Sequence, residues 1–366
     1  MAHTILFLFI GVSSPFIGRM VDRHGARKVI FTGAIMAGLG FALLSQMSNL
    51  WHFYIGYAFI GVGMASIGFV PASIVVSNWF QKRRGLAIGL MAAGIGVGGF
   101  VLAPLVGGYL IPGFGWRASY LALALLTWVF IIPSALFVIK TRPSDMGLYP
   151  DGIKPAEAVA SIKVSSPIPQ GLTLTMALTT SAFWLIAISF FLNHFSHGGT
   201  IQNQVPHLSD IGFPVTIAAT ALGSVALASA VGKLGFGWLC DWIPAKYALA
   251  IGLCFQLMSI IVLVSIKPES PVVLIWLYAI LMGLGVGSWL PTMSMVVSST
   301  FGLASFGAIF GAITLAQSIG NATGPAMAGF MYDSMNTYHW PFVIFIVLYL
   351  ISIPAILLVR RPRNTA

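Results

Sequence analysis

The chain has 366 residues, of which 58% are hydrophobic and 7% are charged, and its mean hydropathy is +0.95. Soluble domains carry about 25% charged residues, so this composition excludes a water-soluble protein and predicts one that lies in a membrane. The net charge of +10 does not indicate nucleic-acid binding, because the basic residues occur in short segments between apolar runs.

Apolar segments of about 20 residues, the length that crosses a bilayer, recur along the whole chain. We distinguish eleven, at residues 2–18, 29–47, 53–77, 86–110, 118–139, 181–206, 215–239, 247–266, 272–298, 305–332 and 339–359. The sequence therefore predicts an all-α, polytopic membrane protein with about eleven transmembrane helices.

Basic residues are distributed unequally between the two sides that these segments define. All but two of the 18 lysines and arginines fall on one side, and the exceptions are Arg117 and Lys267. Loops rich in lysine and arginine stay in the cytoplasm. We therefore expect a multi-pass protein of the cell (inner) membrane, with its C-terminus in the cytoplasm and Met1 on the outer face.

Two short basic motifs follow apolar segments in the two halves of the chain. The first is Gly18-Arg19-Met20-Val21-Asp22-Arg23-His24-Gly25-Ala26-Arg27-Lys28, and Gly237 to Lys246 is a weaker copy in which Asp241 takes the place of Asp22. Glycine permits a tight turn between helices, and a carboxylate such as Asp22 can face either a helix N-terminus or a nearby arginine. Two copies half a chain apart indicate a duplicated membrane unit.

The first motif resembles the signature loop between the second and third helices of the major facilitator superfamily, and the second resembles its degraded copy between the eighth and ninth. This resemblance implies two pseudo-symmetric helical bundles of twelve helices in total, with a cavity between them. In the family the loop locks the cytoplasmic sides of the two halves together. The residues that the resemblance implies for this latch are Gly18, Asp22, Arg23, Gly25, Arg27 and Asp241.

Because the signature loop follows the first apolar segment here, we expect the family's first helix to be missing from this chain. A cleaved signal peptide explains residues 1–18 less well, because they lack a basic leading region. The implied domains are an N-terminal bundle over residues 1–139 (helices equivalent to 2–6), a cytoplasmic linker over 140–179, and a C-terminal bundle over 180–366 (helices equivalent to 7–12). Residues 78–87 and 142–152 resemble loops of the monocarboxylate and oxalate/formate antiporter-like branch.

Polar side chains recur at helical spacing inside two apolar segments. Residues 189–204 present one polar face, and residues 314–321 present another. Such groups are costly in hydrocarbon, so they face either a water-filled cavity or neighbouring helices. We predict that substrate is bound by Asn193, His194, His197, Gln204, Gln317, Asn321, Tyr57 and Trp289. Histidine is the residue type whose unperturbed charge change falls near neutral pH, so we expect any coupling ion to be a proton.

These features predict a secondary active transporter of a small organic solute that works by alternating access. The branch resemblance favours a monocarboxylate, but residues 215–231 and 305–333 lack lysine and arginine, and Lys233 lies near the cytoplasmic end of its segment. An exporter of hydrophobic or drug-like compounds and an inactive truncated transporter remain as alternatives. We expect no enzyme activity, cofactor or metal, because no catalytic or metal-ligand pattern occurs. We also expect no nucleic acid as a partner, and a monomer surrounded by the lipid bilayer.

Overall fold

The computed structural model describes residues 2–152 and 171–362, without the side chains of residues 100, 103 and 104. Within these residues the chain consists of helices, turns and one isolated bridge between Gly171 and Gly302, which confirms the all-α fold. The helices are α1 (Ala2–His24), α2 (Ala26–Ser45), α3 (Leu50–Ile67), α4 (Phe69–Trp79), α5 (Arg84–Pro104), a π turn (Leu105–Leu110), α6 (Ile111–Pro133), a second π turn (Ser134–Val138), α8 (Leu174–Leu178), α9 (Ser181–Asp210), α10 (Val215–Leu239), α11 (Ala245–Ser265), α12 (Val273–Phe301), α13 (Phe306–Met335) and α14 (His339–Leu357).

Eight helical rods among the described residues are long and apolar enough to cross a membrane. α9 and α13 have 30 residues each, but polar side chains interrupt their apolar surfaces. The number of about eleven spans therefore stays a prediction. Of the predicted linker, residues 143–146 and 150–152 form 3-10 turns, and residues 153–170 lie outside the described part of the chain.

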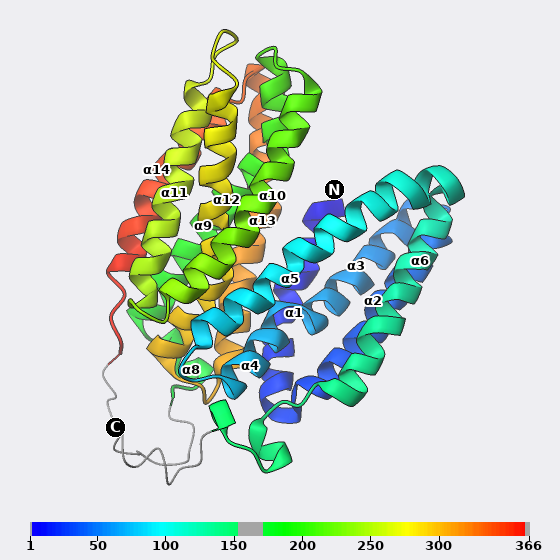
Figure 1. The fold of residues 1–366 in the computed structure, drawn as a ribbon, viewed down its shortest axis with the longest axis vertical. Helices are drawn as coiled ribbons and strands as arrows, with labels where there is room; N and C mark the ends of the chain where they lie inside the picture. Colours follow the sequence, from blue (N-terminus) through cyan, green and yellow to red (C-terminus); the bar gives the residue numbers. More distant parts are fainter. Residues whose placement is uncertain (1, 153–170, 363–366) are drawn as a thin grey trace.

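The helices form two bundles, α1 to α6 and α9 to α14, which approach each other near α4 and α8 and diverge toward their opposite ends (Figure 1). The long pairs that join them are α1 with α13 and α5 with α10. Small residues permit this close approach: a Cβ on Gly11 would lie 2.6 Å from that of Ser318, and Gly311 packs on the backbone of Ser14. Shape rather than apolarity drives helix association in lipid, so these contacts hold the halves together.

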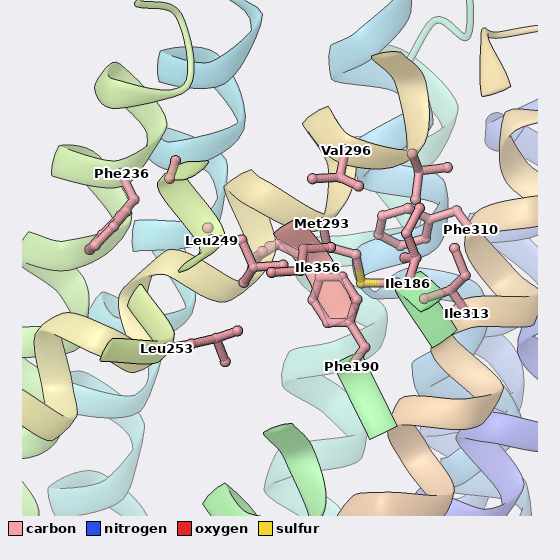
Figure 2. Packing of buried hydrophobic residues seen from close by; sticks show 14 of the residues in the cluster. Ile186, Phe190, Phe236, Leu249, Leu253, Met293, Val296, Phe310, Ile313 and Ile356 are labelled. Atoms are coloured by element: carbon pink, nitrogen blue, oxygen red, sulfur yellow. The ribbon is translucent and has the colours of Figure 1, made fainter. Parts of the chain in front are cut away.

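The second bundle contains the larger apolar core (Figure 2). Phe190 of α9, Met293 of α12 and Phe310 of α13 converge there and are almost fully buried. Leu249 and Leu253 of α11 close the core from the other side. This packing fixes α9, α12 and α13, the three helices that carry the predicted substrate-binding residues of the second half.

The first basic motif is helical except at Gly25, so the loop expected there is wrong. Residues 18–24 are the last turns of α1, and Gly25 alone interrupts the helix before α2 begins. Gly25 has a φ of 83°, a conformation that favours glycine, and a Cβ there would lie 2.9 Å from Oγ1 of Thr141. The predicted apolar segment ends at Gly18 because the residues that follow are basic. The helix itself continues through them to His24. The second copy does contain a loop, at residues 240–244.

Candidate functional site

Asp22 connects the two bundles through the N-terminus of α13. Its carboxylate accepts hydrogen bonds from the backbone N–H groups of Gly307 (3.1 Å) and Ala308 (3.0 Å). The first N–H groups of a helix have no partner within the helix, and the helix dipole makes this end positive. Asp22 therefore caps a helix of the other half of the chain.

Asp241 makes the corresponding contact in the opposite direction. It follows α10, and its carboxylate accepts hydrogen bonds from the N–H groups of Gly85 (2.7 Å) and Leu86 (3.0 Å) at the start of α5. Each bundle thus supplies a carboxylate that caps a helix of its partner, and we call this pair the reciprocal caps. The same geometry at both copies is the structural counterpart of the repeated motif.

Glycines bring the reciprocal caps within reach. A Cβ on Gly18 would overlap the carbonyl group of Gly307, and a Cβ on Gly237 would lie 2.6 Å from the carbonyl oxygen of Gly85. A larger side chain at either position would push the helices apart. Arg23 and Arg27 do not take part in these contacts: both are exposed, and they line a cavity beside the end of α1.

A central cluster of aromatic and amide groups lies inside the second bundle, formed by His194 and His197 of α9, Trp289 of α12 and Gln317 of α13. The rings of His194 and Trp289 are 4.9 Å apart, and those of His194 and His197 are 6.3 Å apart. The indole N–H of Trp289 donates to Oε1 of Gln317 over 3.0 Å. Nδ1 of His194 pairs with the carbonyl oxygen of Phe190 at 3.0 Å.

The central cluster lies near the middle of α9 and α12 and touches the first bundle. At about 1.5 Å per residue, Trp289 is roughly 18 Å from the end of α12 and His194 roughly 20 Å from the start of α9. Phe69, the first residue of α4, packs edge-on against Trp289 with ring centroids 4.8 Å apart. The cluster is thus placed at the junction of the two bundles.

The remaining predicted site residues lie in other surroundings. Gln204 is fully buried, and its Oε1 accepts a hydrogen bond from the hydroxyl of Tyr278 over 2.7 Å, within the second bundle. The hydroxyl of Tyr57 lies 3.4 Å from that of Tyr120 in the first bundle. Asn193 is buried on α9, and Asn321 is buried on α13 against Gly198.

Lys233 is a buried charged residue that was not among the predicted site residues. Its side chain is 7% exposed, and among the described residues it is the only lysine, arginine, aspartate or glutamate that is buried. Its backbone contacts Gly89 of α5 and Gly287 of α12, and no charged group in the described part of the chain offsets its burial. The available signal was that the apolar segment predicted at residues 215–239, which forms α10, continues beyond Lys233 to Leu239.

Residues 1–325 match the family model described as Major Facilitator Superfamily. The chain belongs to the major facilitator superfamily. It is 27% identical over 331 residues to monocarboxylate transporter 13 of Bos taurus, covering 90% of this chain and 73% of that protein. It is 28% identical over 343 residues to the multidrug resistance protein MdtG of Salmonella typhi, covering 89% and 76%.

The fold is also that of solved family members. The crystal structure of the E. coli fucose:proton symporter FucP matches with a TM-score of 0.68 at 14% identity, covering 99% of this chain and 90% of that one. Family and relatives together confirm that the protein is a multi-pass membrane transporter of small solutes and not an enzyme.

Proposed function

We propose that this transporter carries a small organic anion, a monocarboxylate, by alternating access between its two bundles. The observation that carries the proposal is the buried charge of Lys233. An unpaired ammonium inside a membrane protein is costly, and such residues mark substrate or ion pathways. A carboxylate bound nearby would offset that cost.

Lys233 lies where the bundles part. About one turn away, toward the ends where the bundles diverge, Ala230 still packs against Gly96 of α5. Further along α5 the contact is lost: a Cβ added to Gly98 or Gly99 would have no described atom within 4 Å. Lys233 is therefore at the closed base of the junction between α5 and α10. Because its backbone contacts Gly287 on α12, two residues before Trp289, it is at the depth of the central cluster.

The central cluster supplies the uncharged part of this site. The side-chain oxygen of Gln317 accepts a hydrogen bond from Trp289, so its amide N–H groups are left as donors. His194 and His197 add ring nitrogens, and we propose that protons are coupled through them. The chain shares its fold with FucP, a fucose:proton symporter, which supports a proton as the coupling ion. The 27% identity to a monocarboxylate transporter supports the same substrate class.

We propose that the reciprocal caps are the latch of the transport cycle. Both lie at the end of the molecule that holds the α1–α2 junction and the α10–α11 loop, here called the basic end, which we assign to the cytoplasm. The structure then corresponds to a state closed toward the cytoplasm. We further propose an inner-membrane location and a monomer.

A second candidate is export of hydrophobic or drug-like compounds. Similarity to MdtG favours it, as does the half-buried aromatic pair of Phe69 and Trp289, since aromatic rings stack on flat apolar solutes. Such a substrate would not require Lys233.

The test is transport into liposomes by the full chain, with labelled short monocarboxylates and a fluorescent cationic drug measured in parallel. We expect saturable carboxylate uptake that falls at least tenfold in Lys233→Gln, and unchanged uptake in Lys82→Gln, which removes an exposed lysine of the same charge. Uptake of the drug but not of any carboxylate, or undiminished carboxylate uptake by Lys233→Gln, would contradict the proposal.

A further inference from the structure

A cavity of about 430 Å³ opens at the basic end, where α1 ends, α2 begins and the chain leaves α6. Five cationic side chains line it: Arg23, Arg27, Lys28, Lys140 and Arg142. We call it the basic pocket. Its size is that of a typical small-ligand site, and none of its bases takes part in the transport proposal.

The carboxylates of the basic pocket are already engaged with backbone amides. Asp22 accepts from the N–H groups of Gly307 and Ala308, and Asp145 accepts from the backbone N–H of Arg142 over 3.1 Å. Two carboxylates therefore stand against five bases, and the pocket has an excess of positive charge. It is suited to bind an anion.

The walls of the basic pocket are held by hydrogen bonds between distant segments. Oγ1 of Thr141 accepts from the N–H of Ala26 over 2.8 Å, which ties the end of the first bundle's last helix to the start of α2. The Asn78 side-chain amide donates to the carbonyl of Thr141 (3.1 Å), and the Trp79 indole donates to that of Lys140 (2.9 Å). The bases thus project from a fixed frame, which lowers the entropic cost of binding.

The pocket adjoins a surface that faces lipid. Phe137 and Val138, directly before its lining residues, are 79% and 73% exposed. Phe16, on the neighbouring α1, is 68% exposed. Apolar side chains this exposed on a membrane-spanning helix contact acyl chains.

We propose that the basic pocket binds the phosphate-bearing headgroup of an anionic phospholipid, whose acyl chains lie along the exposed apolar side chains at residues 137 and 138. Basic pockets between transmembrane helices on the cytoplasmic side bind anionic headgroups by charge. A dissolved phosphate anion shares the headgroup chemistry but gains nothing from the apolar surface, so the lipid is the favoured source. This inference does not depend on which solute is transported.

The test measures lipid binding to the full chain, purified in a neutral detergent. Phosphatidylglycerol, phosphatidylcholine and inorganic phosphate are added separately, and binding is followed by native mass spectrometry and by the thermal unfolding midpoint. We expect phosphatidylglycerol to bind more tightly than phosphatidylcholine. The double variant Lys28→Gln/Arg142→Gln should weaken phosphatidylglycerol binding at least tenfold, whereas the control Lys82→Gln/Arg83→Gln removes two exposed bases of the same end and should not.

Equal affinity for the two lipids, or equal loss in the pocket and control variants, would overturn the proposal. Stabilisation by inorganic phosphate equal to that by the lipid would overturn the lipid assignment. A photoreactive anionic lipid on the unmodified protein provides a second measurement, independent of the variants' folding. Crosslinks should map to residues 137–142, and crosslinks confined to other helices would contradict the pocket.

Discussion

The reciprocal caps make the balance between the two states of the transporter sensitive to two single side chains. Replacing Asp22 with alanine removes two hydrogen bonds to the N-terminus of α13, and Asp241→Ala removes two from α5. Loss of a capping carboxylate costs about 0.5–2 kcal/mol, and its interaction with the helix dipole contributes about 0.3–1 kcal/mol of overlapping energy. Each substitution should therefore weaken closure of the basic end by about 1–2 kcal/mol.

The two effects should add, because the caps act on different helix pairs, α1 with α13 and α5 with α10. The double variant should then lose about 2–4 kcal/mol, which shifts the equilibrium toward the open basic end by roughly 30- to 1,000-fold. Asp22→Asn should have a smaller effect than Asp22→Ala, because the amide keeps one acceptor oxygen.

The shift can be measured as a distance between spin labels at Lys82→Cys in the first bundle and Arg360→Cys in the second, after both native cysteines have been replaced. Asp145→Ala is a matched control, since within residues 2–152 and 171–362 the hydrogen bond of this carboxylate is local, to the N–H of Arg142. An unchanged distance distribution in the well-folded double variant would refute the latch.

Other predictions concern the central cluster and the helix contacts. His197→Ala should reduce transport sharply, because a methyl group neither binds an anion nor carries a proton. Membrane insertion should be unchanged; uptake assays measure the first effect and expression levels the second. Gln204→Leu should lower the thermal unfolding midpoint, because the buried Tyr278 hydroxyl loses its acceptor at a cost of about 1–3 kcal/mol. The KM of the fraction that stays folded should remain near that of the wild type. Gly18→Val should abolish closure of the basic end in the label-distance assay, and Gly99→Val, in open space, should not.

Composition and periodicity predicted the class of the fold because both depend on the medium around the protein, here the lipid bilayer. Burial in lipid requires apolar helices, and the extents of α10 and α11 follow the hydropathy closely. The exact helix ends did not follow, since hydropathy changes at the membrane surface whereas a helix ends where its hydrogen bonds end. Gly18 to His24 stayed helical for this reason.

Partners distant in the chain could be predicted only in part. The repeated motif singled out Asp22 and Asp241, but it left a helix N-terminus and an arginine open as partners of Asp22, and nothing in the sequence named Gly307 or Gly85 as donors. The polar stripe on α9 contained groups with different roles, because a helical period does not distinguish a side chain bonded inside a bundle from one at its edge. Gln204 and His194 belong to that same segment, yet only His194 touches the aromatic ring at the junction of the bundles.

The central cluster and the reciprocal caps are linked by the movement that alternating access requires. Phe69 belongs to the first bundle and Trp289 to the second, so opening the basic end must alter their contact as it releases Asp22 and Asp241. A ligand shifts a conformational equilibrium only by its difference in affinity for the two states. A solute bound at Lys233 and Trp289 of the second bundle would meet this condition if it also contacts Phe69 of the first bundle, which packs against Trp289. Substrate binding can therefore act on the latch without touching it.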